Sequence, residues 1–90
     1  MGILEACAGI LNFTADEVLK GGRKGNLPMV RHLYAYISRR TTSYSLEYIG
    51  SVIGRDHASI LHSVKTINNF LDINDCFVLE LLDKLDYLYD

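Results

Sequence analysis

The chain has 90 residues, of which 49% are hydrophobic and 22% are charged, and its formal net charge at pH 7 is −2. This length suits a single domain, and this composition excludes a disordered protein. No apolar run reaches the roughly 20 residues that span a bilayer, and Met1-Gly2-Ile3 does not begin a basic secretory leader, so we expect a soluble, intracellular protein without a membrane partner.

The small net charge conceals an uneven distribution. Residues 1–19 carry −3, residues 20–65 carry +6 and residues 66–90 carry −5. Only a basic face attracts phosphate, so the middle of the chain is the candidate nucleic-acid binder, with an ordinary solvated mixture of charges as the alternative. Cys7 and Cys76 lie far apart without metal-ligand spacing, and we expect both to be small buried hydrophobes in a reducing compartment.

Apolar residues at steps of three and four predict a first helix from Ile3 to Leu11, ended by Asn12 or Phe13. The next four residues, Thr14 to Glu17, have the form of a capping box. They predict a short second helix from Ala15 to about Lys20.

Gly21-Gly22 ends the second helix, and a flexible basic loop follows from Arg23 to Asn26. Pro28 suits the first turn of a third helix because its φ is fixed and it lacks an N–H. Three arginines, Arg31, Arg39 and Arg40, are expected at or beyond the margins of that helix's buried stripe, which consists of Val30, Leu33, Tyr34 and Ile37.

After a loop at residues 41–44, two helices joined by a tight turn predict a helix-turn-helix at about residues 46–70. Ser45 is the expected N-cap of the first of these helices, which spans residues 46–53, and Gly54 supplies the turn. Asp56 caps the second, which runs from His57 to about Phe70 or Leu71 and is expected to bury Ile60, Leu61, Val64 and Ile67.

Asn74-Asp75 marks a boundary before an acidic last helix, at about residues 76–89. Its acidic side chains are expected to face outward, and its inward positions are Val78, Leu81, Leu82, Leu85 and Leu88. No segment indicates a strand, so the prediction is an all-α domain of six helices, one of them short.

The helix-turn-helix carries a dense motif, which reads Ile49-Gly50, Gly54-Arg55-Asp56-His57, Ala58-Ser59 and Ile60-Leu61-His62-Ser63. With this motif the chain resembles the C-terminal DNA-binding domain of the bacterial replication initiator DnaA. The resemblance extends more weakly from about Ile3 to Ile67 and leaves out most of the acidic last helix. It implies that residues 1–90 are one Trp-repressor-like domain of the DnaA C-terminal type.

The N-terminal turn of a recognition helix meets base edges in the major groove. There Asp56 can accept from cytosine N4, His57 can reach a base or a phosphate, Ala58 can contact a thymine methyl group, and Ser59 can donate to a base or a phosphate. The resemblance to DnaA implies the same four positions. A purely structural helix cap is the alternative for Asp56, and we expect His62 to be a packed, hydrogen-bonded histidine.

Counted back without gaps from Arg31, which aligns with an arginine at the start of the matching DnaA helix, Arg23 falls where the family inserts an arginine into the minor groove. An arginine there senses the negative potential of a narrow A·T-rich groove. The predicted phosphate contacts are Lys24, Arg31, Arg39, Arg55 and Lys65. Solvated charge is the alternative for each of these residues.

Several positions depart from the family pattern. Gly54 stands where many members have two glycines, Ala58 replaces a hydroxyl residue, and Thr66 replaces a residue that is commonly charged. The 90 residues contain no GxxxxGK[ST] phosphate-binding loop, so we expect no nucleotide, no other cofactor and no ATPase. No nucleophile accompanies Asp56-His57 at a suitable spacing, and we expect no enzymatic activity.

The expected function is therefore sequence-specific binding of double-stranded DNA of the DnaA-box type, linked to DNA replication initiation or its regulation. A cytoplasmic, nucleoid-associated location in a bacterium or phage system follows. The alternative is a protein-interaction module or regulator of the initiator, which would contact its partner through the acidic last helix and its Leu81, Leu85 and Leu88 stripe. A DNA mimic that uses the same acidic helix is a third interpretation.

Overall fold

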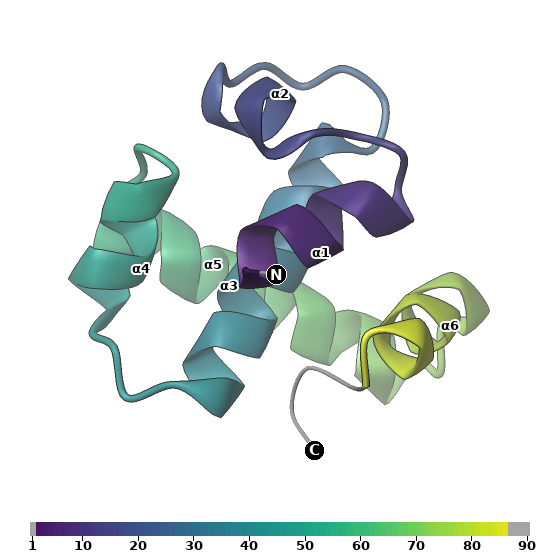
Figure 1. Ribbon diagram of the computed structural model, residues 1–90. Helices are drawn as coiled ribbons and strands as arrows, with labels where there is room; N and C mark the ends of the chain where they lie inside the picture. Colours follow the sequence, from purple (N-terminus) through teal and green to yellow (C-terminus); the bar gives the residue numbers. More distant parts are fainter. Residues whose placement is uncertain (1, 87–90) are drawn as a thin grey trace.

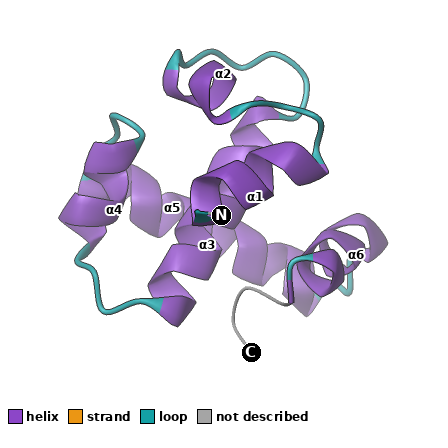
Figure 2. Cartoon of the chain, in the orientation of Figure 1, coloured by secondary structure: helices purple, strands orange, loops and turns teal. Residues whose placement is uncertain are grey.

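The structure, a computed structural model, describes residues 2–86, in which six α-helices and no strand are present (Figure 1, Figure 2). These six helices confirm the prediction of an all-α fold with six helices. The helices are α1 (Ile3–Ile10), α2 (Ala15–Leu19), α3 (Leu27–Thr41), α4 (Leu46–Val52), α5 (His57–Asp72) and α6 (Cys76–Lys84).

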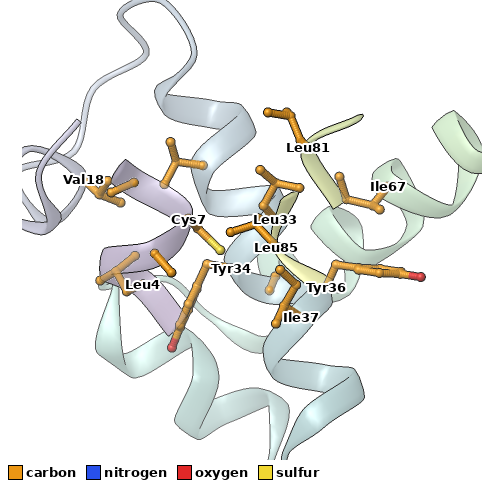
Figure 3. Close-up of a cluster of buried hydrophobic side chains, with 14 of the residues drawn as sticks. Leu4, Cys7, Val18, Leu33, Tyr34, Tyr36, Ile37, Ile67, Leu81 and Leu85 are labelled. Carbon is orange, nitrogen blue, oxygen red and sulfur yellow. The ribbon is translucent and has the colours of Figure 1, made fainter. Parts of the chain in front are cut away.

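Helix α3 lies at the centre of the domain, where it packs against α1, α2, α4 and α5 (Figure 1). Its residues are buried from Val30 to Ser38, with the exception of the half-buried His32, because neighbours cover it on several sides. Leu33 and Ile37 meet side chains from α1, α5 and α6 in the core (Figure 3). The buried Tyr34 hydroxyl donates to the Ile49 carbonyl at 3.0 Å and thereby ties α3 to α4.

The predicted helix starts are confirmed by their caps. The Glu17 amide donates to Thr14 Oγ1 at 3.2 Å and the Thr14 amide donates to Glu17 Oε1 at 3.0 Å, which is the reciprocal capping box. The Tyr48 amide donates to Ser45 Oγ at 3.1 Å at the start of α4. Gly21-Gly22, both with positive φ, follow the end of α2 as expected.

Helix α3 continues through Thr41, which had been predicted to lie in a loop. The hydroxyl groups of Thr41 and Thr42 donate to the carbonyl groups of Ile37 and Ser38 at 2.8 and 2.7 Å. The Thr42 amide also donates to the Ser38 carbonyl, at 3.1 Å, so the two hydroxyl groups reinforce backbone bonding that carries α3 through Thr41.

Burial in the last two helices follows most of the predicted pattern, but Leu61 departs from it and Val64 is only half-buried. Val78, Leu81, Leu82 and Leu85 are buried, and Leu88 lies outside the described residues. Helix α6 ends at Lys84, with Leu85 as its C-cap, short of the predicted end near Tyr89. Leu61 is 44% exposed, because the buried stripe of α5 runs through Ile60, Ser63 and Ile67 and turns Leu61 away from α3.

The two cysteines differ from the expectation that both are buried. Cys7 is enclosed in the core, where burial raises the pKa of its thiol to about 12. Cys76 is exposed at the first residue of α6, and both thiols are free. None of the helices in residues 2–86 has the length and apolar character that crossing a membrane requires.

Candidate nucleic-acid interface

Helices α4 and α5 form the predicted helix-turn-helix, joined by a turn at residues 53–56. Gly54 has a φ of 68° and provides the left-handed residue after α4, and the Arg55 amide donates to the Gly50 carbonyl at 2.9 Å. A Cβ at Gly50 would overlap the backbone carbonyl oxygen of Arg55 and lie 3.2 Å from that of Asp56. Gly50 therefore lets the turn fold back closely onto α4.

Asp56 caps the recognition helix α5. The Ser59 amide donates to its Oδ1 at 2.8 Å, and the carboxyl group is exposed to solvent. Hydrogen bonds from the Ser59 backbone and side chain, with a smaller effect of His57, hold the pKa of Asp56 below its usual value. The structural role expected as the alternative for Asp56 is therefore present, and the carboxyl group that provides it is exposed.

The first turn of α5 presents its side chains to solvent. His57, Ala58 and Ser59 are exposed, and the next residue, Ile60, is buried and anchors the helix against the core. The three exposed residues are the ones that a recognition helix brings to base edges. The fold thus displays the predicted base-reading positions without using them for packing.

A pocket of about 480 Å³ opens beside this first turn. It brings together three arginines from three separate segments: Arg23 from the loop before α3, Arg31 from α3 and Arg55 from the turn. Asp56, Ala58 and Ser59 also line it. The positive charge predicted from the sequence is therefore concentrated next to the N-terminus of α5, which itself favours anions.

Arg31 is buried and not at the margin of α3, in contrast to the prediction. Its side chain is 7% exposed, because the packing of α3 against α5 covers it. Its Nε and Nη2 atoms have no hydrogen-bond partner. Burial, followed by the nearby Arg55 and Arg23, lowers the pKa of the guanidinium group from its usual value. A buried cation without a partner is costly, and an anion in the pocket would compensate its charge.

The other predicted phosphate contacts lie outside this pocket. Lys24 is exposed in the same loop as Arg23, Arg39 is exposed near the end of α3, and Lys65 is exposed further along α5. His57 is exposed in the first turn of α5 and also does not line the pocket. The sequence predicted all of these contacts from their residue types, whereas the structure places only some of the basic residues in one pocket.

Two histidines line the pocket together, and one of them was missed in the sequence. His32 Nδ1 lies 2.8 Å from Ser63 Oγ, a contact that links α3 to α5. His62 is exposed and was wrongly expected to be packed and hydrogen-bonded; its ring meets the His32 ring edge-on, with centroids 6.2 Å apart. The position of His32 directly after Arg31 was the available signal, but its partner is 31 residues away.

The comparisons with known proteins agree with this geometry. Residues 2–67 match the model of a protein family described as the bacterial DnaA protein helix-turn-helix. The chain belongs to the DnaA helix-turn-helix family. Membership of this family implies DNA binding.

Individual DnaA proteins show the same relationship. The chain is 33% identical over 81 residues to the chromosomal replication initiator protein DnaA of Borrelia turicatae, an alignment that covers 84% of this chain and 16% of that protein. It is 26% identical over 82 residues to DnaA of Campylobacter concisus, which covers 90% of this chain and 19% of that protein. The chain thus spans less than a fifth of the length of these relatives, and no solved structure matches it.

The DnaA family match coincides with the basic part of the molecule. It extends from α1 into α5, and it includes the loop with Arg23, the helix-turn-helix and all the basic residues between positions 20 and 65. It ends within α5, before most of the acidic last part of the chain. Among the described residues, no group of three or more His, Cys, Asp or Glu residues is suited to hold a metal ion.

Proposed function

We propose that this chain binds double-stranded DNA of the DnaA-box type and acts in DNA replication initiation or in its regulation. The observation that carries the proposal is the buried guanidinium of Arg31, which lacks hydrogen-bond partners in a pocket shared with Arg23 and Arg55. A DNA phosphate in this pocket would compensate the buried positive charge, and the pocket adjoins the helix end that is expected to read bases. We also propose a cytoplasmic, nucleoid-associated location in a bacterium or phage system.

In the proposed complex, the exposed first turn of α5 enters the major groove. Asp56, His57, Ala58 and Ser59 contact base edges there, and the exposed carboxyl group of Asp56 accepts from a base while it also caps α5. Arg23 enters the adjacent minor groove from the loop before α3. The phosphate contacts in this proposal are Lys24, Arg31, Arg39, Arg55 and Lys65.

Fluorescence anisotropy would test the specificity. A duplex with a DnaA box and a scrambled duplex of the same composition are compared at a fixed, moderate salt concentration. We expect at least a roughly tenfold tighter dissociation constant for the box, since specific sites commonly exceed non-specific ones by larger factors. Equal affinity for the two duplexes would refute sequence-specific binding.

The salt dependence of the affinity tests the assignment of Arg31. Each phosphate contact that is removed should reduce the slope of log K against log salt by about 1. We expect this reduction for Arg31→Ala. An unchanged slope for that variant would remove Arg31 from the phosphate contacts.

A second candidate function is protein binding by the acidic end of the molecule. Leu81 and Leu85, which were predicted to meet a partner, are buried in the core and are not available. The exposed apolar side chains at this end are instead Ile73, Phe77 and Leu79, and their exposure favours this candidate. A monomeric sedimentation profile together with clear duplex binding would argue against it.

A further inference from the structure

The histidine pair beside Arg31 is not among the residues assigned to base or phosphate contacts above. His32 comes from α3 and His62 from α5, and both line the pocket that holds the three arginines. His32 is half-buried, whereas His62 is exposed. In this pocket the protonated form of a histidine is repelled by the surrounding cations.

We propose that His32 is a further phosphate-binding residue and that it takes up a proton when a DNA phosphate enters the pocket. This inference rests on the proposed DNA binding and extends it to the regulation of the same site. The contact with Ser63 fixes the ring, because Nδ1 lies 2.8 Å from the serine hydroxyl oxygen. In the protonated ring Nδ1 donates to that oxygen, and Nε2 carries a second hydrogen that an anion can accept.

The surroundings keep His32 neutral in the free protein. Burial lowers the pKa of His32 below its usual 6.5, and the nearby His62 and Arg31 lower it further. The charged groups that share the pocket are Arg23, Arg31, Arg55 and His62, with Asp56 as the acidic one. Asp56 is engaged by the Ser59 amide as the cap of α5. A phosphate in the pocket would reverse the local sign of charge and favour the imidazolium.

The sign of the pH dependence follows from linkage. Because the pKa of His32 is lower in the free protein than in the complex, the complex binds more protons. Affinity for DNA should therefore increase as the pH falls through the pKa of the complex, and it should level off below the pKa of the free protein. We expect the dissociation constant to decrease by about three- to tenfold between pH 8.0 and pH 5.5 at constant salt.

Variants at the three histidines identify the responsible residue. His32→Gln keeps a polar side chain beside Ser63 and cannot gain the proton, so we expect it to lose most of the increase in affinity between pH 8.0 and pH 5.5, each variant being compared with its own affinity at pH 8.0. His57→Gln and His62→Gln should retain that increase. If it persists in His32→Gln, or disappears only in one of the other two variants, the inference is wrong.

A measurement on the unmodified chain avoids any effect of substitution on folding. The imidazole C–H resonances are titrated by NMR for the free protein and for its complex with a duplex, and we expect the pKa of His32 to be higher in the complex. An equal or lower value would refute the inference. The scrambled duplex is the control that separates this inference from the proposed function. Equal affinity for the box and the scrambled duplex refutes sequence-specific binding. Proton uptake by His32 depends only on the phosphate backbone, which both duplexes share.

Discussion

The two ends of helix α5 are built in the same way and carry opposite charge. Before α5, Gly54 has a φ of 68° and the Arg55 amide donates to the Gly50 carbonyl at 2.9 Å; after α5, Asn74 has a φ of 54° and the Asp75 amide donates to the Phe70 carbonyl at 3.0 Å. An aspartate then caps the next helix in both places, Asp56 for α5 and Asp75 for α6.

The two turns show that a helix, a tight turn and a helix do not by themselves make a DNA reader. Both follow the same pattern of backbone bonds, in which a left-handed residue ends one helix. What distinguishes the first turn is the pocket beside it, with Arg23, Arg31 and Arg55. The second lies among the acidic residues of the chain's last part, where phosphate would be repelled. Function therefore depends on what surrounds the turn.

Gly50→Ala should have the largest effect, because it breaks the first turn. The new methyl group would overlap the Arg55 carbonyl oxygen, a backbone atom that cannot move without opening the turn. We expect a loss of about 3 kcal/mol or more in the free energy of unfolding, measured by chemical denaturation, and loss of DNA binding. Gly9→Ala is the control, because a Cβ added at Gly9 has no atom within 4 Å. This substitution should stabilise α1 by about 0.5 to 1 kcal/mol. Equal stability of the two variants would contradict the prediction.

Arg31→Met should separate stability from binding. It removes a buried cation without partners and keeps an unbranched apolar side chain, so the folded state should gain about 1 kcal/mol. DNA affinity should fall by roughly ten- to a hundredfold, the value of a hydrogen bond to a charged group. The exposed Arg39→Met is the control, with a stability change within about 0.5 kcal/mol. A destabilised Arg31→Met would show that the guanidinium supports the fold and not a ligand.

The two capping aspartates provide a matched pair. Asp75→Ala should cost about 1 kcal/mol of stability by removing the bond from the Val78 amide, and it should leave DNA binding unchanged. Asp56→Ala should also destabilise its helix, and in addition it should weaken binding to the box more than to the scrambled duplex. Similar binding of the two variants would assign Asp56 a structural role only.

The cap at Asp56 also makes a pH-dependent contribution. Its pKa is lower in the folded protein than the usual 3.8, so the stabilisation is complete above that value and is lost as the pH falls through the lowered pKa. Thermal unfolding of the unmodified chain and of Asp56→Asn between pH 2 and pH 6 would detect the difference. Parallel curves would show that the carboxylate does not carry this pH dependence.

The sequence was sufficient for the features that depend on near neighbours. Helix caps such as Thr14 and Ser45, and the glycine turn at Gly54, follow from contacts within a few residues of the chain, and they were predicted correctly. Burial was harder. Leu61 differs from Ile60 by one step of 100° around α5, and only the position of α3 decides which of them is covered.

The site depends on packing between distant segments, which a single sequence does not contain. Arg31 had the right chemistry for phosphate, but its burial arises where α3 meets α5. His32 was overlooked because Ser63, which orients it, lies in another helix. Gly50 was noted only as part of a motif, and the contact with the Arg55 carbonyl gives its physical reason.

Two exposed lysines, one on α5 and one on α6, should show the smallest effects. Lys65 is exposed on α5 in the basic part of the chain, and Lys84 is exposed on α6, where it forms an ion pair with Glu80 at 3.3 Å. Lys65→Ala should reduce the salt slope of DNA binding by about 1, whereas Lys84→Ala should leave it unchanged. Since exposed pairs of this kind contribute less than about 0.5 kcal/mol, Lys84→Ala should also unfold almost like the unmodified chain. If both substitutions change the slope equally, DNA binding depends on the net charge of the whole molecule, and Lys65 does not make a specific phosphate contact.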